Sequence, residues 1–477
     1  MATEQQFLRE YIKAIRDGNA AVFAGAGLSR PSGFVIWKEL LRPLAEDIGL
    51  NIDEEHDLPA VAQYVRNKNG NRAAINSSIL DAYGKDIQCN ENVSILTRLP
   101  IYTYWTTNYD HLIEEGLRDA NRNADVKIES KQLSSTKRDR DAIVYKMHGD
   151  VDHASDAVLT KDDYIKYDMT HPFFRSVLKG DLISKTFLFI GFSFEDPNLD
   201  SIFGQIRLLL DENIRSHYCF MKTVSKSDCK NDEEFGYLKA RQELREQDLL
   251  RFGVQTVFIN DFSEITRILR KIEDAVLADN VFISGSADFF ENGWTKERVE
   301  ELAFKLSNAL VKAEFRVTSG FGLGVGSSVI NGALEEIYHS RYKHMDEHLC
   351  LRPFPQGISD IEENDTWEKY RERILDENGI VIFIFGNKKD SYGNKSEADG
   401  CIQEYILAKK KGRAVIPIGS TGDAAATIYA SVMADKQKDE KSYQYLDKYI
   451  DALKNETDID TIISMVLEIV NKLKIVK

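Results

Sequence analysis

The segment Ala20-Ala21-Val22-Phe23-Ala24-Gly25-Ala26-Gly27-Leu28-Ser29 decides the fold of the first half of the chain. Its apolar residues predict a buried strand, and the Gly-Ala-Gly that follows predicts a tight turn into a helix. Backbone N–H groups in such a turn can approach a phosphate, because glycine carries no side chain. The same turn also joins strand to helix for packing reasons alone, so it needs support from other parts of the chain.

Two further polar segments each follow an apolar stretch. Residues 101–105 lead into Thr106-Thr107-Asn108-Tyr109-Asp110, and residues 142–145 lead into Lys146-Met147-His148-Gly149-Asp150. The carboxyl ends of parallel strands share one edge of a sheet, so these polar residues are expected to converge with the glycine turn. A neutral imidazole accepts protons near pH 7. Together the three segments predict a phosphate cradle, a ribose clamp and a base, a combination suited to NAD.

Four motifs in this order resemble those of the sirtuin superfamily, specifically its bacterial NAD-hydrolysing branch. They are Gly25–Ser29, Thr107–Asp110, His148-Gly149 and Gly191-Phe192-Ser193-Phe194-Glu195-Asp196-Pro197, and the resemblance covers roughly the first 275 residues. It implies that His148 is the base at the nicotinamide ribose and that Asn108 positions the ribose or a water molecule. Further NAD contacts are expected from Gly25, Ala26, Gly27, Ser29, Asp110 and Ser193. Asp110 either contacts the ribose or holds its own loop.

The chain departs from protein-deacylating sirtuins in two places. Those enzymes usually carry a four-cysteine zinc ribbon, whereas the five cysteines here form no C-x-x-C pair, so we expect no metal and no disulfide framework. The acidic-aromatic-arginine segment of deacylases is replaced by Gly33–Leu41. Water is therefore the expected acceptor, with nicotinamide and ADP-ribose as products. An NAD-dependent protein deacylase and a non-catalytic nucleotide sensor or scaffold are the alternatives.

A second alternation of strand and helix patterns begins after residue 278. Predicted strands cover 281–284, 315–318, 348–352, 380–385 and 413–418, with helices between them. We therefore predict an α/β chain of two doubly wound, Rossmann-like domains, residues 1–278 and residues 279–477. Two amphipathic helices over 442–477 carry aliphatic residues at helical spacing, which favours core packing over self-association.

A glycine-rich loop precedes the predicted helix over 327–341, so its amides and the helix dipole can receive a phosphate. With Ser284-Gly285-Ser286 and a helical glutamate, Glu404, this loop resembles the SLOG family of nucleotide-sensing domains over about residues 279–434. The expected activator contacts are Gly285, Ser286, Gly320, Gly322, Gly324, Arg371, Lys388 and Glu404. Arg371, Arg373 and Lys388 are candidate phosphate partners, although each of these cations, and Glu404, could instead be an ordinary surface residue. A related phosphoribohydrolase would need a catalytic arginine and glutamate set that is not evident. The irregularly spaced His339, His344 and His348 do not form a metal-binding pattern.

The order of a sirtuin-like domain and a SLOG domain resembles the NAD-degrading effectors of the bacterial Thoeris antiphage system. That resemblance implies a partner protein with a TIR domain that makes a cyclic ADP-ribose isomer, which binds the SLOG domain and switches on NAD degradation. It also implies homotetramers or larger assemblies. Switching a two-state equilibrium from 1:99 to 99:1 takes about 5.5 kcal/mol of differential affinity, which a buried diphosphate site can supply.

Composition limits the remaining classes. The chain has 477 residues, 43% of them hydrophobic, which is enough for several cores. No stretch approaches the ~20 apolar residues of a membrane span, and the first residues lack a basic-then-apolar leader, so we expect no membrane association and a cytoplasmic location. A formal charge of −15 argues against a broad nucleic-acid-binding surface.

Overall fold

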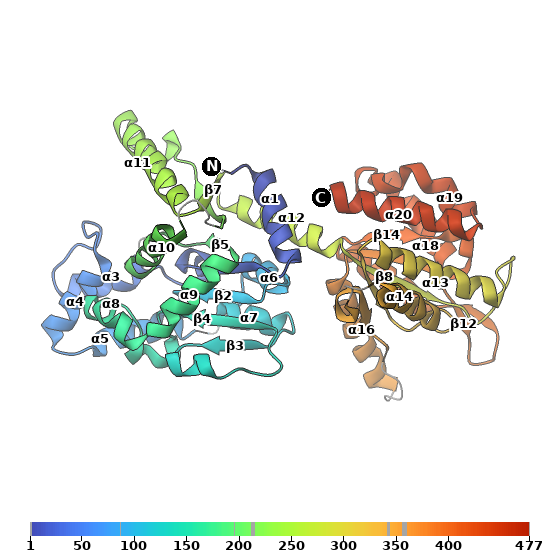
Figure 1. Cartoon of the computed structure of the whole chain (residues 1–477), viewed down its shortest axis with the longest axis horizontal. Helices are drawn as coiled ribbons and strands as arrows, with labels where there is room; N and C mark the ends of the chain where they lie inside the picture. The colour runs from blue at the N-terminus through green and yellow to red at the C-terminus, as the bar shows by residue number, and fades with distance from the viewer. Residues whose placement is uncertain are drawn as a thin grey trace. The chain divides into compact units, whose positions relative to one another are not determined.

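The computed structural model describes residues 2–85, 87–194, 196–210, 215–340, 344–354 and 360–476. The chain divides into two compact units, Met1–Glu273 and Asp274–Lys477 (Figure 1). The division falls inside helix α12 (Ser263–Leu277). Each unit is built on a parallel sheet with helices around it, which confirms the predicted α/β class with two doubly wound domains.

The first unit has a seven-stranded sheet in the order β3-β4-β2-β1-β5-β6-β7, in which every pair of neighbours is parallel. The strands are β1 Ala20–Ala24, β2 Thr103–Thr106, β3 Ala124–Lys127, β4 Ala142–Lys146, β5 Thr186–Ile190, β6 His217–Lys222 and β7 Val254–Ile259. Besides α12, the helices are α1 Glu4–Arg16, α2 Ala26–Ser29, α3 Trp37–Asp47, α4 Leu58–Asn69, α5 Ala73–Tyr83, α6 Glu91–Arg98, α7 Leu112–Asp119, α8 Lys161–Thr170, α9 Pro172–Ser184, α10 Pro197–Leu210 and α11 Asp232–Arg251.

The central strands of this sheet are buried on both faces, as parallel sheets require. Every residue of β1 and β5 is buried. Phe23 and Phe189 stack across these two strands with ring centroids 5.2 Å apart, and Trp105 of β2 stacks on Tyr145 of β4 at 4.2 Å. The apolar runs that predicted the strands therefore form the core that fixes the strand ends.

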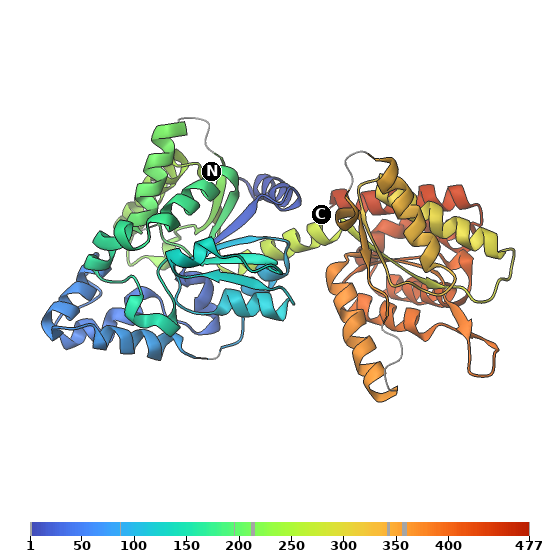
Figure 2. The same ribbon diagram turned by 60° about the horizontal axis from the view of Figure 1, so that its bottom comes forward.

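The second unit has a five-stranded parallel sheet in the order β10-β9-β8-β11-β14. Helices surround this sheet in the yellow-to-red part of the chain (Figure 2). Its strands are β8 Asn280–Ser286, β9 Arg316–Ser319, β10 Leu349–Leu351, β11 Ile380–Phe385 and β14 Ala414–Pro417, and β12 Asn387–Lys389 pairs with β13 Lys395–Glu397 as an antiparallel hairpin. The helices are α13 Lys296–Lys312, α14 Gly326–His339, α15 Met345–His348, α16 Asp360–Glu377, α17 Asp399–Lys410, α18 Asp423–Lys438, α19 Ile450–Asn455 and α20 Ile459–Val476.

The last helix, α20, belongs to the core of the second unit. Ile462, Val466 and Ile469 are fully buried in the same apolar cluster as β8 and β11, and α20 packs against α13. The predicted core packing of this helix is confirmed.

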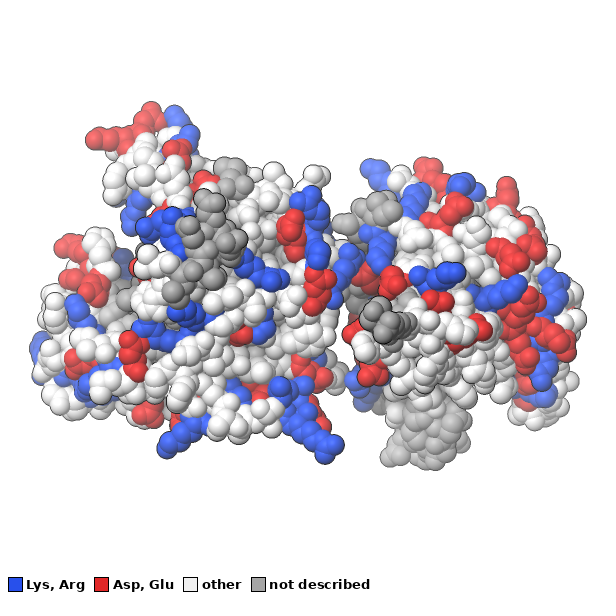
Figure 3. Space-filling view, in the orientation of Figure 1, with Lys and Arg blue, Asp and Glu red and all other residues white. Residues whose placement is uncertain are grey.

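Two further properties concern the length of the helices and the distribution of surface charge. Within the described residues, no helix combines the length and apolar character needed to span a bilayer. On the face shown in Figure 3, lysine and arginine side chains are interspersed with aspartate and glutamate over both units.

Candidate functional site

The carboxyl ends of four neighbouring strands define one edge of the first sheet. β1 lies between β2 and β5, and β4 lies beyond β2. The residues that follow these strands are Gly25 after β1, Asn108 after β2, His148 after β4 and Gly191 after β5. The parallel register therefore gathers the predicted motifs at the edge where open α/β sheets bind ligands.

The glycine turn after β1 packs tightly on the residues that follow β5. A Cβ atom on Gly25 would lie 2.4 Å from the Gly191 carbonyl oxygen, and one on Gly27 would lie 2.8 Å from Gly191 Cα. The Gly25 amide donates to Ile190 O and the Gly27 amide donates to Gly191 O, both at 2.9 Å. The close approach of two backbone segments thus explains why both residues are glycines. The N–H groups of both residues already donate hydrogen bonds within the protein.

Asn108 is buried and lies directly over this turn. Its Nδ2 donates to Gly25 O at 3.1 Å and to Ser29 Oγ at 2.9 Å, and its backbone N–H donates to Thr106 Oγ1. Asp110 accepts the Leu112 amide at 3.1 Å, and burial raises the pKa of its carboxyl. The structure therefore brings Gly25, Ser29, Asn108 and Asp110 into one polar cluster.

His148 has no solvent-exposed surface. Its ring packs against Trp37 with centroids 5.4 Å apart and against the edge of Tyr164 at 5.6 Å. Nε2 lies 3.1 Å from Asp196 Oδ2, but neither ring nitrogen makes an aligned hydrogen bond among the described residues. Nε2 thus faces a carboxylate at close range.

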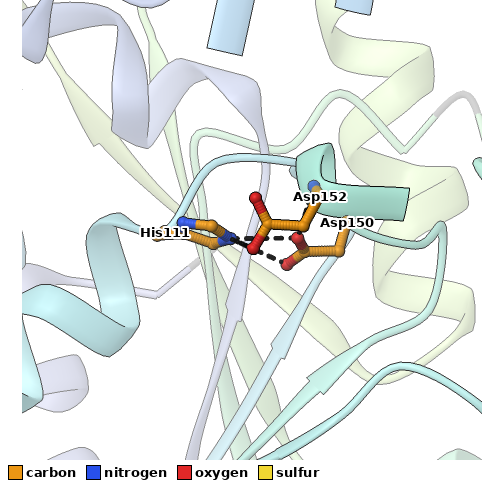
Figure 4. Close-up of side chains that lie close together, drawn as sticks. All are labelled: His111, Asp150 and Asp152. Carbon is orange, nitrogen blue, oxygen red and sulfur yellow. Dashed lines mark hydrogen bonds and ion pairs between the residues drawn. The ribbon is translucent and has the colours of Figure 1, made fainter. Parts of the chain in front are cut away.

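A buried ion-pair network supports the strand end that carries His148. Lys146 Nζ lies 2.5 Å from Asp150 Oδ2 and 3.1 Å from Glu114 Oε1, and it donates to the Asp110 carbonyl at 2.7 Å. Figure 4 shows His111 facing Asp150 and Asp152, with His111 Nε2 2.9 Å from Asp150 Oδ1. Burial opposes charge on Lys146, but the two carboxylates outweigh burial and raise its pKa. The network ties the loops after β2 and β4 together.

Ser193 is exposed rather than enclosed with these groups. Its carbonyl accepts a hydrogen bond from Arg245 Nη2 at 3.1 Å, and the Phe194 carbonyl accepts one from the same nitrogen at 2.6 Å. Glu195, part of the predicted motif, lies outside the described residues. Arg245 of α11 therefore fixes the segment that follows β5.

The predicted activator residues of the second unit gather at the ends of β8, β9 and β11. A Cβ atom on Gly322 would lie 1.9 Å from Gly285 O, and Gly324 has a φ of +73° with Ala287 O 2.0 Å from its ideal Cβ. Ser286 donates to Asn387 O at 2.8 Å. Gly320 and Gly322 thus begin a loop that lies directly against the end of β8.

Arg371 and Glu404 are buried in this unit, which corrects the alternative that they are surface residues. Ser284 Oγ donates to Glu404 Oε2 at 2.5 Å, and Arg371 Nε lies 3.9 Å from Glu404 Oε1. The Arg371 guanidinium stacks over Phe354 at 5.2 Å from the ring centroid. Burial raises the pKa of Glu404 to about 7.

Lys388 is half-exposed on β12 and forms an ion pair with Asp399 at the start of α17. Gly400, the next residue, has an ideal Cβ position 3.3 Å from Arg371 Nη2. Two of the three predicted phosphate-binding cations, Arg371 and Lys388, therefore approach the same end of α17. Arg373 is exposed and pairs with Glu377 at 3.3 Å, so the helix presents its two arginines to different surroundings.

Sequence reasoning assigned no role to Asp196, Tyr164, Trp37 or Lys146. Asp196 belongs to the motif at residues 191–197, and Trp37 belongs to the segment that replaces the deacylase motif. Their contacts with His148 depend on how distant segments pack. Lys146 follows directly on an apolar run, which was the one signal that its charge is buried.

Two family models describe this arrangement. A SIR2-like domain matches residues 102–244, and the Sir2- and TIR-associating SLOG family (STALD) matches residues 264–473. The chain is thus a sirtuin-like unit joined to a SLOG unit.

Curated relatives share both units. The chain is 44% identical over 470 residues to a protein named NAD(+) hydrolase ThsA from Bacillus cereus (strain MSX-D12), covering 97% of each chain. Proteins of the same name from Cytobacillus dafuensis and Acinetobacter baumannii (strain 532279) are 43% and 42% identical, covering 92% and 89% of this chain and 90% and 89% of theirs. The chain belongs to the ThsA family.

Proposed function

We propose that the first unit hydrolyses NAD+ to nicotinamide and ADP-ribose, with Asn108 and His148 as its catalytic residues. The observation that carries the proposal is the burial of a carboxamide and an imidazole at the ends of paired parallel strands, β2 and β4. Full-length similarity to proteins named NAD(+) hydrolase supports it. Gly25, Ala26, Gly27, Ser29, Asp110 and Ser193 are the proposed dinucleotide contacts.

The chemistry follows from these groups. Loss of nicotinamide leaves a ribose with cationic character, which requires positioning, exclusion of bulk water and a nearby proton acceptor. His148 Nδ1 has no hydrogen-bond partner among the described residues. It accepts the proton that the ribose hydroxyl or the attacking water gives up. The Asn108 amide holds the ribose or the attacking water. Since Asn108 Nδ2 now bonds Gly25 O and Ser29 Oγ, substrate binding exchanges these bonds for bonds to the sugar.

Product analysis tests the reaction type. The full chain, NAD+ and a panel of cyclic ADP-ribose isomers should yield nicotinamide and ADP-ribose in equal amounts. An acyl-lysine peptide should not accelerate nicotinamide release. Strong acceleration by the peptide would instead identify a deacylase, and NAD+ binding without turnover under every isomer would identify a sensor or scaffold.

We propose further that a cyclic ADP-ribose isomer binds the second unit and switches the first unit on. The proposed contacts are Gly285, Ser286, Gly320, Gly322, Gly324, Arg371, Lys388 and Glu404. Two cations near the start of α17 suit a diphosphate, since guanidinium binds phosphate as a fork and ammonium binds it as a point charge. Calorimetric titration of the full chain with the isomers tests this site.

The biological role we propose is NAD depletion during antiphage defence in the cytoplasm. The match to a Sir2- and TIR-associating family supports a TIR-domain protein as the source of the signal. Self-association into tetramers or larger assemblies is part of the same proposal, and light scattering with and without the isomers tests it. The proposed catalytic and sensing domains are residues 1–278 and 279–477.

A further inference from the structure

The carboxylate of Asp196 has two oxygens that serve different partners. Oδ1 accepts the backbone amides of Asn198 and Leu199 at 2.9 and 3.1 Å, which caps the start of α10. Oδ2 lies 3.1 Å from His148 Nε2 and accepts the Tyr164 hydroxyl at 3.1 Å. The side chain is 6% exposed. One buried carboxylate therefore connects a helix terminus to the imidazole at the proposed catalytic site.

We infer that Asp196 is a positioning residue for His148 and that Tyr164 holds its carboxylate in place. This inference rests on the proposed role of His148 as base. Which nitrogen of an imidazole carries the proton is set by the hydrogen bond that the other nitrogen makes. The Asp196 carboxylate lies 3.1 Å from Nε2 and favours the tautomer with the proton on Nε2, which leaves the lone pair of the neutral ring on Nδ1.

Among the described residues, Asp196 is the charged side chain that pairs with His148. The other titratable groups that face the ring are neutral. Tyr164 and Tyr167 of α8 lie 5.6 and 6.5 Å from the imidazole, ring to ring. Burial raises the pKa of both phenols, so both are neutral. Burial and repulsion by His148 lower the pKa of His171, which favours its neutral form.

The carboxylate itself remains ionised despite its burial. Burial raises the pKa of Asp196, but the positive charge of the imidazolium and the hydrogen bonds that the carboxylate accepts outweigh this effect and lower its pKa. The ionised carboxylate therefore lies 3.1 Å from Nε2, where it orients the ring.

The same contacts make the position of the base depend on the segment between β5 and α10. Arg245 of α11 fixes the Ser193 and Phe194 carbonyls, and Phe194 has a φ of +57°, in the left-handed region. Displacement of the start of α10 would move the Asp196 carboxylate and release His148 Nε2. The positioning of His148 is therefore sensitive to the conformation of this segment.

Two substitutions separate positioning from a merely structural role. Asp196→Asn keeps the shape and the helix cap, because asparagine and aspartate cap helices about equally well. It removes the negative charge and points an amide toward Nε2, which favours the wrong tautomer. Tyr164→Phe removes the hydroxyl that holds the carboxylate.

Each substitution has a matched control in the same unit. Asp57 caps α4 through Oδ1 and the Ala60 amide at 3.0 Å, so Asp57→Asn repeats the chemical change away from the imidazole. The buried Tyr11 hydroxyl donates to the Ala21 carbonyl at 2.9 Å. Tyr11→Phe therefore removes a buried tyrosine hydroxyl from the same unit without touching the carboxylate or the groups that face His148.

The experiment measures nicotinamide release by the full chain over a range of pH, with the cyclic ADP-ribose isomer panel present. We expect Asp196→Asn to lower kcat about 100-fold with little change in KM, and to change the pH profile. Tyr164→Phe should lower kcat about tenfold, and both controls should keep the wild-type profile. Wild-type kcat and pH profile in Asp196→Asn, alongside an inactive His148→Ala variant, would overturn the inference.

A wild-type chain that releases no nicotinamide would refute the proposed function and would leave the inference to be decided by spectroscopy. Nitrogen NMR of histidine-labelled full chain, with the His148 signals identified by their loss in His148→Ala, reports the ring tautomer. Protonation on Nε2 in the wild type and a different tautomer in Asp196→Asn would support the positioning role. Identical nitrogen shifts in the two proteins would contradict it.

Discussion

The two units share a plan but place different chemistry at the same position. Both place a glycine turn that follows one parallel strand against the end of its neighbour: the turn after β1 lies against the end of β5, and the loop after β9 lies against the end of β8. In the first unit that edge buries an imidazole and a carboxamide, 0% and 7% exposed. In the second unit it carries an arginine stacked on an aromatic ring and a half-exposed lysine. The shared topology sets where a ligand binds, and the side chains at the strand ends set what happens there.

Compensation of charge also differs between the two sites. Lys146 of the first unit is matched by two carboxylates within 3.1 Å. Arg371 Nε of the second unit lies 3.9 Å from Glu404 Oε1 and has no hydrogen-bond partner among the described residues. The buried cation of the first site is closely paired with carboxylates, whereas that of the second retains a donor for an anion. This contrast fits catalysis in one unit and ligand sensing in the other.

The largest expected effect comes from removing the catalytic groups of the first unit. His148→Ala and Asn108→Ala should each lower isomer-activated nicotinamide release about a thousand-fold, because a positioned acid or base contributes 10²–10⁴ in rate. Binding of isomers to the second unit should not change. His153→Ala, an exposed histidine in the same segment, is the control. Full activity in His148→Ala would place catalysis elsewhere.

Arg371→Ala should alter the response to the activator without altering the chemistry. A charge-assisted hydrogen bond contributes about 1.5–3 kcal/mol, so the isomer concentration at half-maximal rate should rise about 10- to 100-fold at an unchanged maximal rate. Arg373→Ala, on the same helix but paired with Glu377, should leave the dose–response curve in place. A reduced maximal rate at saturating isomer would contradict the division of roles.

Glu404 should give the second unit a pH-dependent stability. Burial raises its pKa from 4.5 to about 7, so between these values the folded chain holds a proton that the unfolded chain has released. Stability therefore falls as pH rises from 4.5 to 7, by up to roughly 3 kcal/mol. Glu404→Gln should flatten this slope in denaturant unfolding of the full chain, while exposed Glu368→Gln keeps it. Parallel slopes in wild type and Glu404→Gln would be inconsistent with a buried, titrating carboxyl.

The smallest expected effect concerns α12, which contains the division between the units. Glu4 of α1 pairs with Arg267 at 2.8 Å and with Lys271 at 2.8 Å on that helix, and the hydrogen bond from Arg267 is the main cause that lowers the pKa of Glu4 to about 2. The contribution of ionised Glu4 to the stability of the fold is present above pH 4.5 and is lost as the pH falls toward 2.

These side chains are largely exposed, so Glu4→Gln should cost less than about 1 kcal/mol at neutral pH. Denaturant unfolding of the first unit measures it, with Glu10→Gln as the control on the same helix. A loss well above 1 kcal/mol would mean that the pair anchors α12 more strongly than a surface ion pair can.

The sheets were predictable where apolar runs are long. β1, β8 and β11 lie within a residue or two of the predicted strands, because parallel strands buried on both faces require continuous apolar sequence. β3 has the sequence ADVK and lies at a sheet edge, and β6 begins with His217. Burial lowers the pKa of His217 to about 3, which keeps that imidazole neutral in the core. A local pattern does not reveal a histidine that becomes a core residue.

The candidate sites were predictable only in part. Asn108 and His148 follow apolar runs, so their place at the sheet edge follows from the sequence. The partners of His148 come from α3, α8 and the loop before α10, and their convergence depends on tertiary packing. Similarly, Glu404 and Arg371 could be surface residues on sequence grounds, and only the packing of α16 and α17 buries them.

The most direct test of catalysis in one unit under control of the other is nicotinamide release from wild-type full chain at fixed NAD+ while a cyclic ADP-ribose isomer is titrated. The account predicts little release without the isomer and a saturable rise with it, abolished by His148→Ala and shifted to higher isomer concentration by Arg371→Ala. Release that is equal with and without every isomer, or absent under all of them, would contradict it.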